Sequence, residues 1–181
     1  MSTSQFATRL PRHDQDLTGL LGQHFIYTYS NGWLYELYIK NAESVEYRVH
    51  PSTDVVNPLT GRWVKDQKAE IARLGDDVYS VAWNEPTGSC VSLVLNARQR
   101  WVHFTGFLAK WVDDNPGLIV SFQNEHLAEI QRYRDAGPIA PQIQADLFGT
   151  ITFAEDSGID NEQVIACAPG EVPAGFLDRT N

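Results

Sequence analysis

Apolar and polar residues alternate along two runs that flank Asn31-Gly32, one from His24 to Ser30 and one from Trp33 to Lys40. Alternation over this length predicts half-buried β-strands. Asn-Gly between two such runs is the strongest short-range signal for a hairpin, because both residues accept the positive φ of a type I′ turn. The sequence therefore predicts an antiparallel hairpin closed by a two-residue turn.

The apolar face of this hairpin carries three phenol hydroxyls. Successive side chains of a strand point to opposite faces, and we expect the apolar faces to point inward. Buried hydroxyls need partners, so these tyrosines are either a packed structural cluster or part of a site that holds something polar. Glu36 and Lys40 fall on the opposite face, which we expect to meet solvent. The inward side chains are Phe25, Tyr27 and Tyr29 on the first strand and Trp33, Tyr35 and Leu37 on the second.

Short strands separated by turn signals continue along most of the chain. Many closely spaced strands indicate an antiparallel sandwich or barrel, and a closed barrel leaves an interior lined by alternate side chains. We therefore expect a mostly β, antiparallel barrel with one or two short helices, one of them at Glu125–Arg134 and ended by Gly137-Pro138. The expected strands are Phe25–Ser30, Trp33–Lys40, Val45–His50, Arg62–Leu74, Val78–Asn84, Ser89–Asn96, Trp101–Leu108, Leu118–Asn124 and Ile143–Ala154.

The ends of the chain lack this alternation. Residues 1–16 are polar with mixed charges, and we expect them to form a flexible extension. Residues 17–181 are expected to form a single barrel domain, in which the segment after Asp156 is rich in Gly, Pro and Asn and therefore irregular.

Composition narrows the range of partners. The chain has 181 residues, of which 43% are hydrophobic and 20% charged, and its net charge of -9 disfavours binding to nucleic acid. No apolar run approaches the roughly 20 residues that span a bilayer, and no apolar core typical of a signal peptide is present. Cys90 and Cys167 stand apart, in no metal or redox spacing. We expect a cytoplasmic protein without a nucleic-acid or membrane partner.

Two charged residues are candidates for chemistry. Strand parity places Glu85 on the same face as Trp83, where burial would raise the pKa of the carboxyl group and leave a neutral acid able to donate a proton. Alternatively, Glu85 caps the turn at Pro86-Thr87-Gly88. Arg62 follows a glycine and stands beside aromatic residues, where its planar fork suits a carboxylate or a phenolate. The commoner alternative is a surface arginine paired with one of the many acids.

Other signals of catalysis are absent from the sequence. The five histidines form no pair with metal-ligand spacing, so no metal site is predicted. There is no Gly-x-Ser-x-Gly elbow, dinucleotide fingerprint or phosphate loop. We therefore expect no cofactor.

Six motifs together resemble the phenolic acid decarboxylases, also called ferulate or p-coumarate decarboxylases. The resemblance runs in order from about Asp16 to Ala168, and several of its motifs are long. It rests on Tyr27-Thr28-Tyr29-Ser30-Asn31-Gly32-Trp33, Tyr47-Arg48-Val49-His50, Gly61-Arg62-Trp63-Val64-Lys65-Asp66-Gln67, Trp83-Asn84-Glu85-Pro86-Thr87-Gly88, Lys110-Trp111-Val112 and Phe122-Gln123-Asn124-Glu125-His126.

The resemblance implies a cofactor-free, lipocalin-like barrel that forms a homodimer and converts 4-hydroxycinnamic acids to 4-vinylphenols and carbon dioxide. Carried over by motif, its pocket groups are Tyr27, Tyr29, Tyr35, Arg62 and Glu85. Protonation of the alkene carbon next to the carboxylate yields a quinone methide, so the substrate is its own electron sink. Glu85 is the expected proton donor. Whether Tyr27 and Tyr29 hold the carboxylate or the phenolate stays open at this stage.

Two of the departures from the family pattern adjoin the expected pocket. The loop at residues 51–60 is about five residues longer than usual and adjoins Arg62, so it is a candidate lid. The family typically reads His-Gly-Thr-Ile-Phe-Phe-Pro where this chain has His103-Phe104-Thr105-Gly106-Phe107-Leu108-Ala109. Gly106 and Leu108 would remove volume from the lining, so we expect them, with Trp83 and Tyr35, to contact substrate in a roomier pocket.

Three functions fit these observations. The leading one is a phenolic acid decarboxylase acting on p-coumaric, ferulic and caffeic acids. The second is a related lyase that uses the same chemistry on a bulkier or different para-hydroxyphenyl compound, as the altered strand around Gly106 suggests. The third is a lipocalin-like protein that binds a phenolic ligand without turnover, against which the presence of Glu85 and Arg62 argues.

Overall fold

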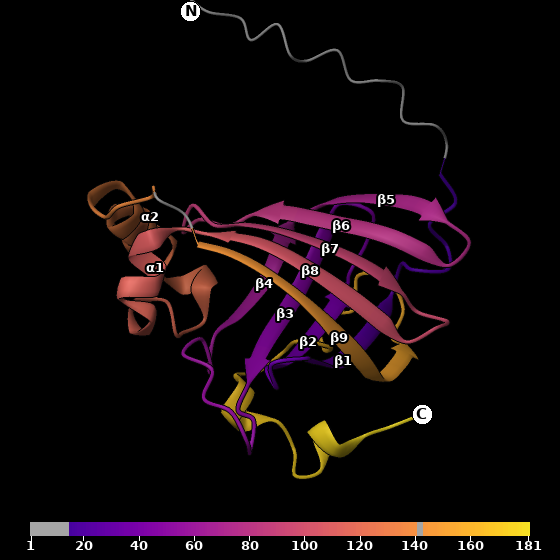
Figure 1. The fold of residues 1–181 in the computed structure, drawn as a ribbon. Helices are drawn as coiled ribbons and strands as arrows, with labels where there is room; N and C mark the ends of the chain where they lie inside the picture. The colour runs from indigo at the N-terminus through magenta and orange to yellow at the C-terminus, as the bar shows by residue number, and fades with distance from the viewer. Residues whose placement is uncertain (1–14, 141–142) are drawn as a thin grey trace, which may run out of the picture.

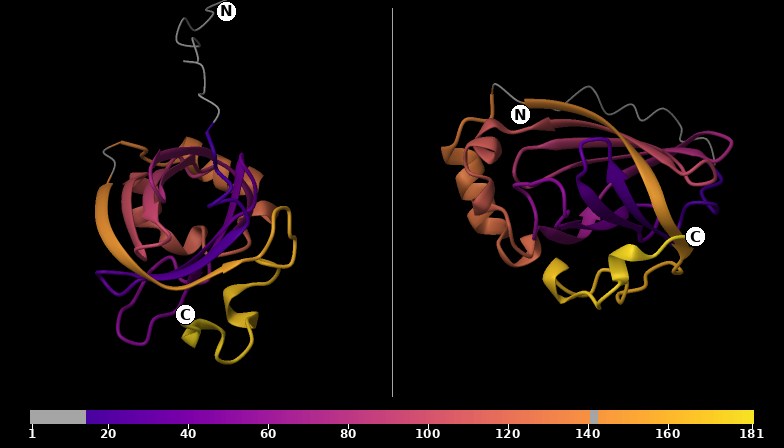
Figure 2. Two further views of the ribbon diagram at one scale, coloured as in Figure 1. Left: turned by 90° about the vertical axis from the view of Figure 1, so that its right-hand side faces the viewer. Right: turned by 60° about the horizontal axis from the view of Figure 1, so that its bottom comes forward.

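The computed structural model describes residues 15–140 and 143–181. Nine antiparallel strands form one sheet in the order β4-β3-β2-β1-β9-β8-β7-β6-β5 (Figure 1). The sheet curls into a nearly closed barrel, seen as a ring of strands in the left view of Figure 2. The predicted mostly β barrel is therefore confirmed. The strands are β1 (Gln23–Tyr29), β2 (Leu34–Ile39), β3 (Ser44–His50), β4 (Trp63–Lys68), β5 (Glu70–Gly75), β6 (Val78–Asn84), β7 (Cys90–Asn96), β8 (Trp101–Leu108) and β9 (Ile143–Asp156).

The hairpin of β1 and β2 has the predicted inward face but not the predicted turn. Tyr27 pairs with Tyr35, which leaves a three-residue loop. Only Gly32 in that loop has a positive φ, of 85°, and its amide donates to the Tyr29 carbonyl (2.8 Å). A two-residue turn would pair Thr28 with Tyr35 and place Tyr27 and Tyr35 on opposite faces. The longer loop therefore brings the tyrosines together.

Two predicted strands are wrong. The single strand Arg62–Leu74 is divided at the buried Ala69, whose amide donates to the Glu43 carbonyl (2.8 Å), so β4 and β5 lie at opposite ends of the sheet. The run Leu118–Asn124 forms no strand. It overlaps two 3₁₀ turns, η1 (Pro116–Leu118) and η2 (Gln123–Glu125). Between them, Phe122 forms one isolated bridge with Trp63 of β4.

The segment around η2 covers the free edge of β4. The Trp63 amide donates to the Ser121 carbonyl (3.2 Å), and the rings of Trp63 and Phe122 stack with centroids 4.0 Å apart. The Asn124 side chain accepts from the Lys65 amide (2.9 Å) and donates to its carbonyl (2.8 Å). These groups satisfy backbone donors and acceptors that would otherwise be exposed at the edge of the sheet.

Helices gather at one end of the barrel (Figure 1). Helix α2 (Leu127–Ala136) lies within two residues of the predicted helix and ends at Gly137 as expected. A shorter helix, α1 (Lys110–Asp114), was not predicted. Two more 3₁₀ turns, η3 (Pro169–Glu171) and η4 (Phe176–Asp178), interrupt the irregular C-terminal segment. Among the described residues, no helix is both long and apolar enough to cross a membrane.

The C-terminal segment, residues 157–181, runs along the outside of β1, β2 and β3 (Figure 2). The Tyr38 hydroxyl donates to the Gly158 carbonyl (2.5 Å), and Arg48 donates to the Val164 carbonyl (3.2 Å). This covering makes the prediction of a solvent-facing surface wrong, because Glu36 is 0% and Lys40 5% exposed.

Under this cover, the carboxylate of Glu36 is surrounded by cations and donors. His24 Nε2, His50 Nε2 and Arg48 Nε each lie 2.7 Å from one of its oxygens. Burial by itself raises the pKa of Glu36, but the hydrogen bonds from the histidines and Arg48 outweigh it and hold the pKa well below the ordinary value. The outer face of the hairpin is thus a second, polar core.

Candidate active site

Three tyrosines from the first hairpin form a cluster inside the barrel. The ring centroid of Tyr29 lies 5.2 Å from that of Tyr27 and 5.3 Å from that of Tyr35, and Tyr27 and Tyr35 are 6.1 Å apart. The strand pairing of Tyr27 with Tyr35 fixes this arrangement. All three side chains line one cavity in the barrel.

These phenols are neutral near neutral pH. Burial raises the pKa of Tyr27 and Tyr29 well above the ordinary tyrosine value, and the hydrogen bond between them lowers that of Tyr27 and raises that of Tyr29. Burial also raises the pKa of Tyr35 to about 12, against the opposing effect of the positive charge of Arg62. Neutral hydroxyls can donate hydrogen bonds to an anion.

Glu85 stands at the end of β6, as strand parity predicts, and three side chains hold its carboxylate. Its Oε1 accepts from the Tyr47 hydroxyl (3.0 Å), and its Oε2 accepts from Thr87 Oγ1 (3.1 Å) and lies 3.0 Å from Arg62 Nη2. Glu85 is 8% exposed. Glu85 also begins the expected turn, because the Gly88 amide donates to the Glu85 carbonyl (2.9 Å). The backbone of Glu85 closes this turn, and its carboxylate accepts from the turn residue Thr87 while it lines the cavity.

Arg62, just before β4, is buried rather than on the surface. Besides Glu85, its Nη2 donates to Oε1 of Gln123, a residue of η2 that is 1% exposed. The guanidinium carbon lies 5.5 Å from the ring centroid of Tyr47. Burial by itself lowers the pKa of Arg62, but the negative charge of Glu85 outweighs it and raises the pKa. The segment that covers the edge of β4 therefore also positions Arg62.

The cavity contains most of the predicted site residues. Trp83 and Leu108 line it, whereas Gly106 does not, because the ring of Phe104 occupies the space above it. The expectation of free space at Gly106 is therefore wrong. The long loop contributes Leu59 to the wall. The lining residues are Tyr27, Tyr29, Trp33, Tyr35, Tyr47, Val49, Leu59, Arg62, Trp83, Glu85, Val91, Leu93, Phe104 and Leu108.

Two donors of lining residues have no partner among the described residues. Arg62 Nε and Trp83 Nε1 are buried without a hydrogen bond. A buried donor without an acceptor costs about 1–3 kcal/mol, so a ligand that brings acceptor oxygens gains affinity by satisfying it. The unpartnered donors and the neutral phenols suit an anionic, oxygen-bearing ligand.

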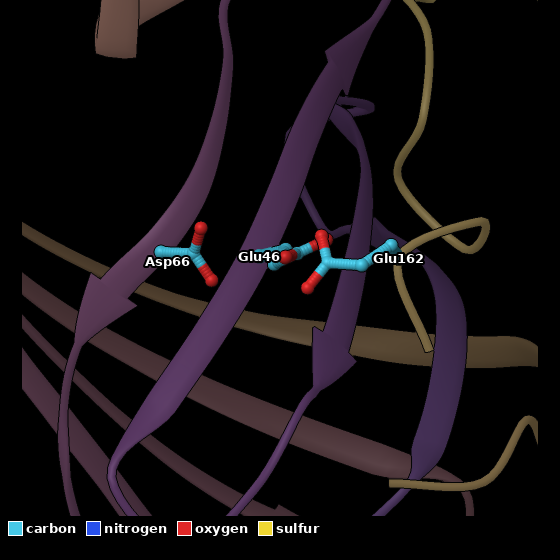
Figure 3. A group of neighbouring side chains, drawn as sticks. All are labelled: Glu46, Asp66 and Glu162. Carbon is cyan, nitrogen blue, oxygen red and sulfur yellow. The ribbon is translucent and has the colours of Figure 1, made fainter. Parts of the chain in front are cut away.

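One group of carboxylates has a spacing that would allow a metal ion. Glu46, Asp66 and Glu162 converge outside the barrel from β3, β4 and the C-terminal segment (Figure 3). The ammonium group of Lys40 already lies among them, 3.2 Å from Glu46 and 2.5 Å from Asp66, with Glu162 as a third partner. The lysine therefore supplies the positive charge that these carboxylates need.

Comparison with known proteins identifies the family of this chain. A sequence model of the phenolic acid decarboxylase family matches residues 17–179. The chain belongs to the phenolic acid decarboxylase family. A protein named probable phenolic acid decarboxylase from Vibrio cholerae serotype O1 is 47% identical over 161 residues, which cover 89% of this chain and 90% of that protein. Phenolic acid decarboxylase PadC from Bacillus subtilis is 40% identical over 155 residues, which cover 86% of this chain and 93% of that protein.

As a member of this family the protein is a carboxy-lyase that acts on phenolic acids. Tyr47, Phe104 and Gln123 are among the side chains in and around the cavity that the sequence had not singled out as site residues. Tyr47 shares the inward parity of Val49, so alternation on β3 could have identified it. Phe104 shares the parity of Gly106 and Leu108. Gln123 fell in a segment wrongly predicted as a strand, and no local pattern indicates its bond to Arg62.

Proposed function

We propose that this decarboxylase converts p-coumaric, ferulic and caffeic acids to 4-vinylphenols and carbon dioxide without a cofactor. The observation that carries the proposal is the buried pair of Glu85 and Arg62 in the same cavity as three neutral phenols. The pair combines a proton donor with a carboxylate-binding cation, and the phenols provide hydrogen-bond donors for a phenolate.

The reaction needs an acid rather than an electron-accepting cofactor. Direct loss of carbon dioxide from a vinylic carbon would leave an unstabilised carbanion. In the proposed route the substrate phenolate pushes electrons toward the alkene while a proton from Glu85 bonds to the carbon that bears the carboxylate, giving a quinone methide. The bond to the carboxylate then breaks, its electron pair forms the vinyl double bond and restores the aromatic ring, and carbon dioxide leaves. Solvent returns a proton to Glu85.

Proton transfer requires the substrate carboxylate and Glu85 to lie side by side. At Arg62 the substrate carboxylate competes with Glu85 for the guanidinium, and two carboxylates held this close share a proton more readily than two separate charges do. Tyr47 and Thr87 keep the carboxyl group of Glu85 oriented through their hydrogen bonds. Holding the acid and the alkene carbon together supplies the proximity that proton transfer needs.

We place the carboxylate of the substrate at Arg62 and its phenolate at Tyr27 and Tyr29. Protonation occurs at the carbon next to the carboxylate, so Glu85 and the carboxylate must lie close together, and Arg62 is the only cation lining the described cavity. The ring centroid of Tyr35 lies 5.3 Å from that of Tyr29 and 6.1 Å from that of Tyr27. Besides burial, the charges of Arg62 and Glu85 affect the pKa of Tyr35. Raised pKa values keep Tyr27 and Tyr29 protonated as donors to the phenolate.

Turnover tests the function directly. The purified protein is mixed with p-coumarate, caffeate or ferulate, and we expect the ultraviolet absorbance of the acid to fall as carbon dioxide and the vinylphenol appear in equal amounts. If no simple hydroxycinnamate is consumed, the proposal fails. That outcome would favour a related lyase with a different para-hydroxyphenyl substrate.

Two inert fragments test the orientation. Cinnamate has the carboxylate without the phenol, and 4-ethylphenol has the phenol without the carboxylate. We expect Tyr29→Phe to weaken the binding of 4-ethylphenol more than that of cinnamate. Arg62→Gln should weaken the binding of cinnamate more than that of 4-ethylphenol. Quenching of tryptophan fluorescence measures both affinities. The opposite pattern would show that the carboxylate lies at the tyrosines.

We also propose that the enzyme is a cytoplasmic homodimer, as the resemblance to its family implies. Sedimentation velocity at micromolar concentration should give twice the mass of 20.3 kDa. A monomer at that concentration would contradict this part of the proposal.

A further inference from the structure

The ring of Phe104 fills the space inside the barrel that a side chain at Gly106 would occupy. Phe104 and Gly106 lie two residues apart on β8 and share its inward face. A Cβ atom built on Gly106 would lie 2.2 Å from Cζ of Phe104 and 2.8 Å from its Cε2. The backbone of Gly106 is not in the left-handed region, so its conformation does not require glycine. The ring of Phe104, which lies over its Cα, does.

The Phe104 ring also packs against the tyrosine cluster. Its centroid lies 5.6 Å from that of Tyr29. Phe104 lines the cavity, as does its strand partner Leu93 on β7. Val91, the partner of Gly106, continues the same wall. This wall is apolar, and its Phe104 ring, from β8, contacts the phenol ring of Tyr29. Arg62 and Glu85 lie in another part of the cavity, beside Tyr47.

We propose that Phe104, seated on Gly106, determines how large a substituted aromatic ring this decarboxylase accepts. The proposal rests on the function and orientation argued above, which place the phenol ring of the substrate beside Tyr29. A ring whose tip is packed against a glycine forms a rigid wall, because it cannot move any further toward the backbone and also contacts Tyr29. Substituents next to the phenol hydroxyl, such as the two methoxy groups of sinapate, meet this wall first.

The test compares sinapate with p-coumarate as substrates. We expect Phe104→Ala to raise the ratio of kcat/KM for sinapate over that for p-coumarate by at least about tenfold, within the range by which a cavity wall discriminates small groups. The matched control is Phe107→Ala on the same strand, whose side chain is 41% exposed on the outer face, and its ratio should equal that of the wild type. Urea unfolding of each variant verifies that the fold persists.

A double-mutant cycle distinguishes this wall from general loosening of the core. Gly106→Ala should push the Phe104 ring into the cavity and raise KM for p-coumarate about tenfold, whereas the same change in the Phe104→Ala background should leave KM within about twofold. The proposal would be overturned if Phe104→Ala lowered kcat/KM equally for sinapate and p-coumarate. It would also be overturned if Gly106→Ala raised KM for p-coumarate by the same factor in both backgrounds.

Binding separates failure of this inference from failure of the proposed function. The inert phenols 4-ethylphenol and 4-ethyl-2,6-dimethoxyphenol differ only in the two methoxy groups, and Trp33 and Trp83 in the cavity wall report their binding by fluorescence. Phe104→Ala should improve the relative affinity for the dimethoxy compound even if the wild type consumes no hydroxycinnamate. An unchanged affinity ratio would reject the role of Phe104, whatever the enzyme turns over.

Discussion

Glu85 and Arg62 form an ion pair of 3.0 Å across the seam where the two ends of the sheet approach each other. Arg62 precedes β4, the strand at one end of the sheet, and Glu85 follows β6, next to the other end. Beside this pair, Gln67 on β4 donates to the Asn84 carbonyl on β6 (3.2 Å). The active site that we propose is thus assembled by closure of the barrel, and its charged groups depend on that closure.

Replacement of Arg62 by lysine should impair the enzyme although the charge is kept. The guanidinium contacts Glu85 and Gln123 from one nitrogen and leaves Nε for a ligand, and a lysine ammonium cannot reproduce this planar arrangement. We expect kcat/KM for p-coumarate to fall about 100-fold, a loss of about 3 kcal/mol of transition-state stabilisation. Arg98→Lys, at a side chain 81% exposed, is the control and should keep full activity. Equal activity of the two variants would contradict the role given to Arg62.

Removal of the Tyr47 hydroxyl should have a smaller effect. Tyr47→Phe loses one hydrogen bond to Glu85 but keeps the ring, which stacks on Trp83 with centroids 5.9 Å apart. A less well oriented acid should lower kcat about 10- to 100-fold. Loss of one hydrogen bond to a charged group removes about 1.5–3 kcal/mol of stability, so the melting temperature should fall by roughly 3–12 °C. A kcat equal to that of the wild type would show that Tyr47 does not orient the acid.

Acid should weaken the polar core beneath the C-terminal segment. The pKa of Glu36 is lowered, so its charged form stabilises the fold fully above the ordinary value of 4.5, and this contribution is lost as the pH falls below 4.5 toward the folded-state pKa. Glu36→Gln should lower the free energy of unfolding by about 3–5 kcal/mol at pH 7 and by a smaller amount at pH 3, where the contribution of the charged carboxylate is partly lost. Urea titrations at both values measure this, with the exposed Glu43→Gln as control. The same loss at both pH values would contradict the account.

Lys40→Met tests whether the lysine neutralises the three outer carboxylates. It would leave the fully buried Glu46 without a cation, and we expect the free energy of unfolding to fall by about 3–5 kcal/mol. Lys68→Met, at an exposed position of the same sheet, should change it by less than about 0.5 kcal/mol. Restoration of wild-type stability by added magnesium or calcium would show that the carboxylates act as a metal site when the lysine is absent. A stability unchanged in Lys40→Met would refute the ion-pair role.

Local pattern predicted the inside of this barrel better than its outside. Alternation placed Tyr27, Tyr29 and Tyr35 on the inward face although the turn type was wrong, because the face of each strand depends on parity alone. Glu36 has the same polar pattern as any solvent-facing residue. Its burial arises from a segment more than 100 residues later in the chain, and hydrophobic periodicity contains no information on that contact.

The same limit applies to the cavity. Parity and motif resemblance together identified Glu85 and Arg62, but their contact depends on the closure of the sheet and could not be read from either strand. Gly106 looked like lost volume because a glycine contributes no side chain. The filling ring comes from Phe104, two residues away on the same face, and only the three-dimensional packing shows where that ring points.

The central claim is that Glu85 donates the proton that makes decarboxylation possible. The most direct measurement is the rate of carbon dioxide release from p-coumarate by Glu85→Gln, with Glu43→Gln as control and with folding verified by circular dichroism. General acid catalysis contributes about 100- to 10,000-fold, so we predict a loss of at least 100-fold in kcat while the variant still binds p-coumarate. Carbon dioxide release by Glu85→Gln at the wild-type rate would contradict the account.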